Sequence, residues 1–192
     1  MENIIINELA LEEFENFMNY LTIHLSENGK DNHFFQPVSK DQLNLDAEWQ
    51  EKFKAGLTKT WGETIWRKLW LAKNRENQIV GHVALSPVTI TDAHSHKTTG
   101  WHGLGPISVL PAWQGQGIGS HLMKQALAEL RAMQAAGCVL LGDPAYYGRF
   151  GFQAHVGLQL PGVPPGYFMA LAFHGPVPEG IVQYSDAFNA AA

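Results

Sequence analysis

The stretch ISVLPAWQGQGIGS, residues 107–120, decides the fold of this chain. A β-branched run enters a turn with glycine at alternate positions, and the residues that follow have the apolar spacing of a helix. Glycine lets the N–H groups of a turn converge because it carries no Cβ. The first N–H groups of a helix have no internal acceptor and carry part of the helix dipole. The stretch therefore predicts a binding site for phosphate oxygens.

The spacing of the glycines distinguishes between known phosphate-binding motifs. A Walker A loop needs a lysine before a serine or threonine, and residues 107–120 contain no lysine. A dinucleotide fingerprint would need glycine where Ser120 stands. The pattern that fits is Gln-x-x-Gly-x-Gly, formed by Gln114, Gly117 and Gly119. On these residues alone, a glycine-rich connection without a ligand is the alternative.

The residues on either side of the turn predict an α/β chain of the α+β type, with an antiparallel meander followed by a strand–helix–strand crossover. Apolar runs and alternation predict strands at residues 4–6, 69–73, 78–91, 101–110, 138–141, 158–160 and 167–173. Helical spacing predicts helices at 11–25, 47–59 and 117–136, with short ones near 63–67 and 145–150. Gly137 is expected to end the long helix, and Pro106 predicts an edge or a bulge in its strand.

Composition limits the possible functions. The chain of 192 residues is 45% hydrophobic, which suits one domain with a packed core. Residues 1–78 hold 13 acidic and 9 basic side chains, whereas residues 79–192 hold only 5 and 4. The net charge of −5 argues against a nucleic-acid partner, and a single cysteine, Cys138, excludes a disulfide scaffold. We find no secretory signal and no uninterrupted apolar span, so we expect a cytoplasmic protein with no membrane partner.

A second motif further along the chain makes the interpretation specific. Residues 147–152, Tyr-Gly-Arg-Phe-Gly-Phe, match Tyr-x-x-x-Gly-Phe, and Val109 and Pro111 precede Gln114 at a matching spacing. Together these motifs resemble the GNAT superfamily of acyl-CoA-dependent N-acyltransferases. From about residue 78 to residue 188 the chain resembles one branch of it, the YhbS-like predicted acetyltransferases. The earlier residues resemble the superfamily in layout.

The resemblance implies a fold and a cofactor site. It implies one domain over residues 1–192, with substrate-side strand and helices in 1–77 and the acyl-CoA-binding part in 78–188. The implied fold has a mixed central sheet of about six or seven strands, helices on both faces, and strands splayed at the acyl-CoA site. Acetyl-CoA would be the acyl donor, and its pantetheine arm would pair with the backbone of Ile107, Ser108 and Val109. Its pyrophosphate would lie on a turn braced by Gln114, on the amides of Gly115, Gln116, Gly117, Ile118, Gly119 and Ser120.

The resemblance also implies a reaction. An amine of a small molecule or peptide would attack the thioester directly in a ternary complex. Tyr147 occupies the position of the general acid that protonates the departing CoA thiolate, and Tyr146 is the alternative. Leu140 stands where many members carry an asparagine, seven residues before the tyrosine. A non-catalytic acyl-CoA-binding sensor of the same fold is therefore the alternative function, and a dinucleotide-dependent enzyme is a third hypothesis.

The general base and the amine substrate are not readable from the sequence. His82 and His102 are candidate bases because histidine titrates near neutral pH. Glu27 and Asp31 are alternatives, since they follow the first helix, where this fold places substrate contacts. A homodimer is a possible further partner.

Three further features have structural interpretations. Asp92, His94 and His96 have ligand chemistry, but we favour a solvated loop and predict no metal site. Asp143 is expected to cap the short helix near 145–150. Cys138 begins an apolar strand and is expected in the core.

Overall fold

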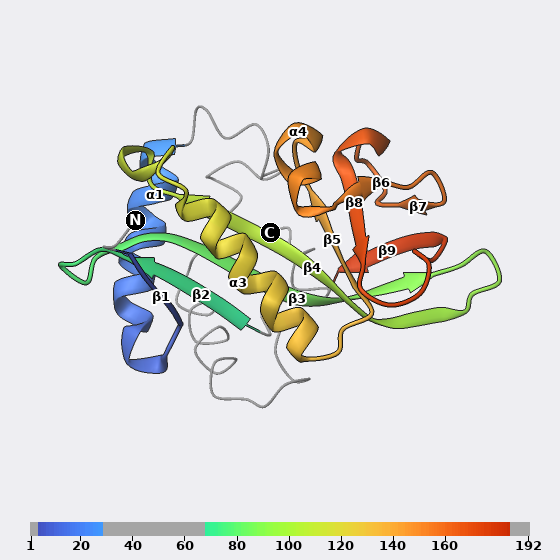
Figure 1. The fold of residues 1–192 in the computed structure, drawn as a ribbon, viewed down its shortest axis with the longest axis horizontal. Helices are drawn as coiled ribbons and strands as arrows, with labels where there is room; N and C mark the ends of the chain where they lie inside the picture. The colour runs from blue at the N-terminus through green and yellow to red at the C-terminus, as the bar shows by residue number, and fades with distance from the viewer. Residues whose placement is uncertain (1–3, 29–67, 185–192) are drawn as a thin grey trace. The chain divides into compact units, whose positions relative to one another are not determined.

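The computed structural model describes residues 4–28 and 68–184 (Figure 1). Its helices and strands are β1 (Ile5–Glu8), α1 (Phe14–Asn28), β2 (Lys68–Lys73), β3 (Ile79–Thr91), β4 (Lys97–Val109), α3 (Ile118–Ala132), β5 (Gly137–Leu141), α4 (Pro144–Tyr147), β6 (Gln153–Ala154), β7 (Leu158–Gln159), β8 (Phe168–Ala172) and β9 (Gly180–Tyr184). Short 3-10 turns are η1 (Leu11–Glu13), η3 (Pro111–Trp113), η4 (Gly148–Phe150) and η5 (Pro165–Tyr167). The helices predicted at 47–59 and 63–67 lie outside the described residues.

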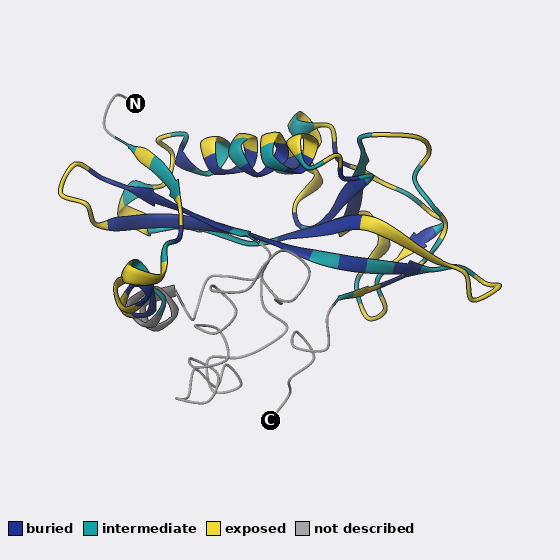
Figure 2. Cartoon of the chain, turned by 90° about the horizontal axis from the view of Figure 1, so that it is seen from below, coloured by how far each residue is buried: buried dark blue, intermediate teal, exposed yellow. Residues whose placement is uncertain are grey.

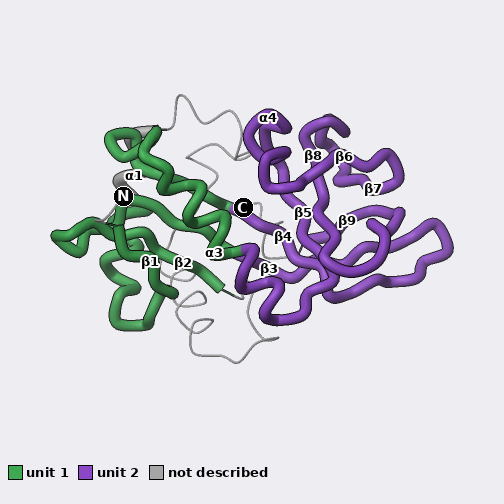
Figure 3. The backbone as a smooth tube through the Cα atoms, viewed as in Figure 1, with its two compact units in different colours: residues 1–84, 106–126, 191–192 green, residues 85–105, 127–190 purple. Residues whose placement is uncertain are grey.

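The described residues group into two compact units, coloured separately in Figure 3. The first unit contains residues 4–28, 68–84 and 106–126, and the second contains 85–105 and 127–184. The strands β3 and β4 contribute to both units. The single domain over residues 1–192 stays a prediction.

Hydrogen bonds arrange the strands in the order β1-β2-β3-β4-β5-β8-β6, with β9 also paired to β3 and β7 paired to β9. The strand β5 runs parallel to β4 and antiparallel to β8. The sheet is therefore mixed, as predicted, but it has nine strands rather than about six or seven, and seven of the nine lie on the main path. The sequence analysis missed β6 and β9. The two residues of β6 are too few to show an alternation, and β9 follows a proline-containing stretch.

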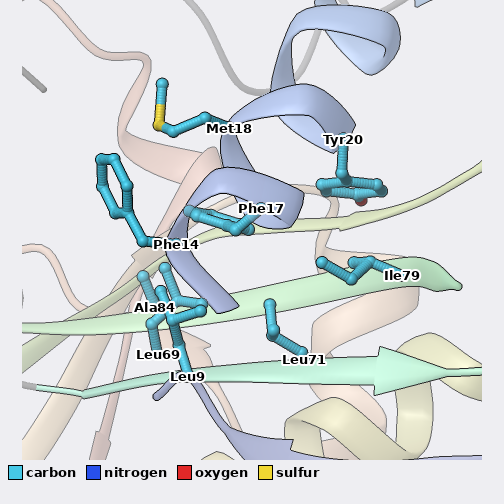
Figure 4. Close-up of a cluster of buried hydrophobic side chains, with 9 residues drawn as sticks. All are labelled: Leu9, Phe14, Phe17, Met18, Tyr20, Leu69, Leu71, Ile79 and Ala84. Atoms are coloured by element: carbon cyan, nitrogen blue, oxygen red, sulfur yellow. The ribbon is translucent and has the colours of Figure 1, made fainter. Parts of the chain in front are cut away.

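Helices cover both faces of the sheet in the first unit. The His82 ring meets the ring of Phe17 on α1 edge-on, whereas the neighbouring Gly81 lies against Leu122 of α3. Successive residues of a strand point to opposite faces, so α1 and α3 lie on opposite faces, as Figure 2 also shows. The core on the α1 face, drawn in Figure 4, consists of Leu9, Phe14, Phe17, Met18, Tyr20, Leu69, Leu71, Ile79 and Ala84.

The second unit has a core of its own, in which charged side chains take no part. Every strand except β6 that contributes residues to this unit supplies apolar side chains to it. The buried members are Val88, Ile90, Trp101, Val139, Leu158, Phe168, Ala170 and Val182. Cys138 is fully buried on β5, which confirms its predicted place in the core.

The long helix ends earlier than predicted. It stops at Ala132, and the N–H groups of Gln134 and Ala135 bond back to carbonyls of its last turn at 3.0 Å each. Gln134 has φ +56°, so a glutamine takes the left-handed position that glycine usually fills after a helix. Gly137 instead begins β5, where a Cβ would overlap the ring of Trp101.

Two smaller differences concern the ends of elements. Leu11, predicted on the buried face of the first helix, is 46% exposed. It belongs to η1, whose tighter winding takes it out of the period of α1. The strand β4 starts at Lys97, four residues before its predicted start at Trp101. In the described part of the chain, no helix is both long and apolar enough to cross a membrane.

Candidate functional site

The connection from β4 to α3 forms the predicted glycine turn. After the short η3 turn, the side chain of Gln114 folds back, and its Nε2 donates to the carbonyl oxygen of Val109 at 2.9 Å. Gly115 and Gly117 have φ values of +73° and +84°, which L side chains rarely adopt. The glutamine therefore ties the turn to the last residue of the strand, and Gly115 together with the motif's Gly117 supplies the backbone conformation.

The N-terminus of α3 opens on this turn. Gly117 immediately precedes Ile118, the first helical residue, and has no side chain that could cap the helix. The first N–H groups of a helix lack an acceptor within the helix, and the helix dipole favours an anion beside them. A Cβ placed on Gly115 would meet no atom within 4 Å, so the turn is open there. This arrangement can bind an anion through the backbone of residues 115–120.

A hollow of about 430 Å³ lies beside the same turn. Its lining combines apolar side chains with polar ones from β1, the β2–β3 turn and the start of α3. The lining residues are Ile4, Ile6, Asn74, Arg75, Glu76, Trp113, Gln116, Ile118 and His121. The hollow shares Gln116 and Ile118 with the predicted anion site.

The strand β4 leaves its partner β5 early. The parallel ladder consists of three residue pairs and ends with Gly103 opposite Val139, while β4 continues to Val109. Among the described residues there is no further β4–β5 pair, and the splay expected at an acyl-CoA site stays a prediction. Pro106 lies beyond the ladder, so its missing N–H costs no β4–β5 hydrogen bond. The backbone of residues 107–109 is thus not taken up by pairing with β5.

A buried chain of polar side chains lies on the α1 face of the first unit. His82 on β3 and Tyr20 on α1 are 3% and 6% exposed, and His82 Nδ1 lies 3.3 Å from Tyr20 Oη. The Tyr20 hydroxyl also bonds to the side chain of Ser108. Burial raises the pKa of Tyr20, and the bond to Ser108 partly offsets this rise. The predicted base candidate His82 is thereby connected, through Tyr20, to the predicted cofactor strand.

Tyr147 lies in the second unit at the end of α4. Asp143 caps this helix, as predicted, because its Oδ1 accepts the N–H of Ala145 at 2.9 Å. The Tyr147 ring is 5% exposed and meets the ring of Tyr146 edge-on, with 4.8 Å between centroids. Burial, then the neighbouring Tyr146 and Asp143, raise the pKa of Tyr147. The hydroxyl therefore stays protonated at neutral pH and can act as a proton donor.

The other predicted candidates have separate positions. Leu140, at the position of the family's asparagine, is buried in β5. His102 is buried on β4, within the short ladder to β5. The side chain of Glu27 and the whole of Asp31 lie outside the described residues.

The carboxylate of Asp92 organises the turn between β3 and β4. Its Oδ1 accepts the N–H groups of His94 and His96 at 2.8 and 2.9 Å, and its Oδ2 lies 3.0 Å from His96 Nδ1. These bonds, the His96 N–H foremost, lower the pKa of Asp92. Among residues 4–28 and 68–184, no group of three or more ligating side chains is placed to hold a metal ion.

Comparisons with known proteins identify the family. A GNAT acetyltransferase domain model matches residues 66–154. The uncharacterized N-acetyltransferase YhbS of Escherichia coli K12 is 33% identical over 125 residues, which are 62% of this chain and 72% of YhbS. The chain belongs to the GNAT family of acetyltransferases.

Solved GNAT structures match almost the whole chain. A GNAT acetyltransferase from Brucella melitensis in complex with acetyl-CoA has a TM-score of 0.65 and 32% identity, covering 96% of this chain and 97% of that one. The structure of YhbS from E. coli in complex with CoA has a TM-score of 0.69 and 25% identity, covering 97% and 92%. The GNAT fold predicted from the motifs is therefore confirmed.

The GNAT motif residues and their neighbours were found from the sequence, but Tyr20 was not. The residue follows Phe17 by three positions, so both share the buried face of α1. That spacing could have indicated that the Tyr20 side chain is buried between α1 and the sheet. A tyrosine on the apolar face of a helix is usually interpreted as a core residue, however. Only the fold brings the Tyr20 hydroxyl close to Ser108 and His82.

Proposed function

We propose that this GNAT protein is an acyl-CoA-dependent N-acetyltransferase that transfers acetyl from acetyl-CoA to a primary amine of a small molecule or peptide. The observation that carries the proposal is the turn that Gln114 ties to Val109 and that leads through Gly117 into the N-terminus of α3. Its support is the family membership and the two related structures, one with acetyl-CoA and one with CoA.

The cofactor would be held mainly by backbone groups. The pantetheine arm would add to the edge of Ile107, Ser108 and Val109 as a strand does, using main-chain N–H and C=O groups. The pyrophosphate would accept hydrogen bonds from the amides of residues 115–120, at the positive end of the α3 dipole. Residues 107–120 contain no lysine or arginine, and a site made of amides needs none.

The proposed reaction makes a C–N bond and breaks a C–S bond. The lone pair of the amine attacks the thioester carbonyl carbon, the nitrogen gives one proton to a general base, for which His82 and His102 are candidates, and collapse of the adduct expels the CoA thiolate. Tyr147 then donates its phenolic proton to the sulfur, and Tyr146 is the alternative donor. The raised pKa of Tyr147 keeps the hydroxyl protonated before the reaction, but it also makes the group a weaker acid than an ordinary tyrosine.

Leu140 gives one reason to keep the second candidate function, an acyl-CoA sensor without turnover. A buried leucine cannot supply the amide that many members use to hold the cofactor. Such a sensor would bind acetyl-CoA with no acyl transfer.

A binding and turnover assay tests the proposal. The protein is titrated with acetyl-CoA in a calorimeter and then assayed for CoA thiol release over a panel of primary amines, with NAD as a binding control. Acetyl-CoA binding with amine-dependent thiol release is expected. Binding without release on any amine would favour the sensor, and absence of binding would contradict both. A cytoplasmic location and a homodimer are further proposals, the second checked by light scattering.

A further inference from the structure

The ring of Tyr147 packs against a glycine at the end of β5. Gly142 follows Leu141, the last residue of that strand, and its N–H donates to the carbonyl oxygen of Tyr167 at 2.9 Å. A Cβ added to Gly142 would overlap Cε2 of the Tyr147 ring and would lie 2.7 Å from its Cδ2 and 3.1 Å from its Cζ. Carbon atoms in contact are usually about 3.5–4.0 Å apart, so no side chain fits on Gly142 while the ring is there.

The backbone of Gly142 does not itself require glycine. Glycine is needed where φ is positive, as at Gly115 and Gly117, but Gly142 does not have a positive φ. Its N–H bond could be made by any residue except proline. What the missing side chain provides is therefore room for the Tyr147 ring.

The Tyr-x-x-x-Gly-Phe motif supplies a second contact of the ring. Phe152 is 2% exposed, and its ring meets that of Tyr147 edge-on with 6.5 Å between centroids. Gly151 makes this contact possible, because its φ of +94° and the bond from its N–H to the Gly148 carbonyl form a tight turn just before Phe152. The motif thus returns an aromatic side chain to the tyrosine that begins it.

These contacts extend to the reactive end of the side chain. Cζ, the carbon that carries the Tyr147 hydroxyl, is among the three ring atoms nearest to the position of a Cβ on Gly142. To restore ordinary carbon–carbon distances, a methyl group there would have to displace the ring by about 1 Å. A displacement of that size can lower turnover by about 100-fold even when the displaced group is chemically intact.

We propose that Gly142 and Phe152 are positioning residues that form a seat for the ring of Tyr147. The inference rests on the acetyltransferase function proposed above, with Tyr147 as the proton donor. No bond changes at either residue of the seat. The phenolic proton passes from Tyr147 Oη to the sulfur of the departing CoA thiolate, and solvent returns a proton to the phenolate after product release. The seat acts through Tyr147 by fixing where its hydroxyl points.

The test combines a change in the seat with loss of the hydroxyl. Gly142→Ala adds the methyl group, Tyr147→Phe removes the hydroxyl, and the double variant shows whether both act on the same step. Gly137→Ala is the matched control, because Gly137 begins the same strand and its Cβ would likewise overlap a ring, that of Trp101. Gly148→Ala is a second control, because it adds a methyl group next to Tyr147 in the chain but with no atom within 4 Å.

For each variant, kcat for thiol release, KM for the amine, acetyl-CoA affinity and Tm are measured with the primary amine that the unchanged protein acetylates fastest. Gly142→Ala is expected to lower kcat by about 100-fold, with KM and affinity within about threefold. The double variant should be no slower than Tyr147→Phe, because a displaced ring without a hydroxyl has no proton to misplace. Gly137→Ala should lower Tm and, like Gly148→Ala, leave kcat within about threefold.

A second variant tests the seat without adding atoms beside the strand. Phe152→Leu keeps an apolar side chain but leaves space in which the Tyr147 ring can move. It is expected to lower kcat by about tenfold when Tyr147 is present and to have no further effect in Tyr147→Phe. This variant decides the question if Gly142→Ala does not fold.

Every outcome either supports or overturns the seat. An unchanged kcat in Gly142→Ala, or in Phe152→Leu if Gly142→Ala does not fold, would overturn it and leave the proposed function standing. So would an equal loss of kcat in Gly137→Ala, or a double variant slower than Tyr147→Phe, because the effect would then belong to packing. An unchanged kcat in Tyr147→Phe would show that Tyr147 is not the donor and would overturn the seat as well. Wild-type protein without acetyl-CoA binding or thiol release would contradict the proposed function itself.

Discussion

Two strand-to-helix connections of this chain, from β4 to α3 and from β5 to α4, differ in the residue that precedes the helix. At α4 the carboxylate of Asp143 caps the helix and accepts the N–H of Ala145. At α3 the preceding residue is Gly117, and the nearby polar side chain, Gln114, turns back to the strand. A side chain thus caps the positive end of α4, whereas Gly117 has no side chain that could cap α3, where we propose that a ligand binds.

The difference follows from which residue stands before the helix. Asp143 supplies a carboxylate cap, and Pro144 supplies a first helical residue whose φ is already fixed. Together they stabilise α4 by about 1 kcal/mol. Gly117 forgoes that stabilisation, and glycine at φ +84° instead exposes the amides. The glycine before α3 therefore costs this helix local stability, which the proposed anion site would require, while the cap of α4 supports Tyr147.

The largest expected effect comes from the end of the capped helix. Tyr147→Phe should lower kcat for thiol release by about 100-fold, because the CoA thiolate would leave without its proton donor. Acetyl-CoA affinity should be unchanged. The matched control, Tyr146→Phe, should stay within about threefold. A larger loss in Tyr146→Phe than in Tyr147→Phe would assign the proton donor to Tyr146.

Giving α3 the kind of cap that α4 has should weaken cofactor binding. Gly117→Asp places a carboxylate where the pyrophosphate would bind, and we expect acetyl-CoA affinity to fall by about tenfold or more in calorimetric titration. Gly117→Asn is the control, since it has the same shape and tolerates a positive φ but carries no charge. Equal affinities of the two variants would show that no anion binds at this N-terminus.

A smaller effect is expected from the tie between turn and strand. Gln114→Ala removes the bond to the Val109 carbonyl, worth about 1 kcal/mol, so acetyl-CoA affinity should fall by about fivefold with kcat nearly unchanged. Gln116→Ala, whose side chain makes a longer 3.3 Å bond to Ala112, should lower affinity less. If the two variants bound acetyl-CoA equally, Gln114 would not be bracing the turn.

The smallest effect is expected at the cap of α4. Asp143→Ala releases the N–H of Ala145, and we expect a loss of roughly 0.5 kcal/mol and about a twofold fall in kcat as Tyr147 loses part of its support. Asp143→Asn can still cap and should behave like the unchanged protein in both thermal unfolding and turnover. A twofold loss in Asp143→Asn as well would point to the charge of Asp143 rather than to its cap.

Local chemistry explains why much of the fold and the candidate site could be predicted. The Gln-x-x-Gly-x-Gly spacing specifies a turn in which Gly117 needs a positive φ, and Asp143-Pro144 specifies a capped start, so both connections could be predicted from a few adjacent residues. The ends of elements were less predictable. Gly137 looked like a helix terminator, but Gln134 takes that position and Gly137 makes room for Trp101.

The sequence by itself determined the glycine turn before α3, the capped start of α4, the family and the tyrosine expected to protonate the thiolate. Each depends on residues a few positions apart, where backbone conformation is set by neighbours. Only the tertiary structure decided where β4 leaves β5, and which residues join His82. Tyr20, His82 and Ser108 stand on α1, β3 and β4, and such long-range hydrogen bonds exist only once these elements have packed together.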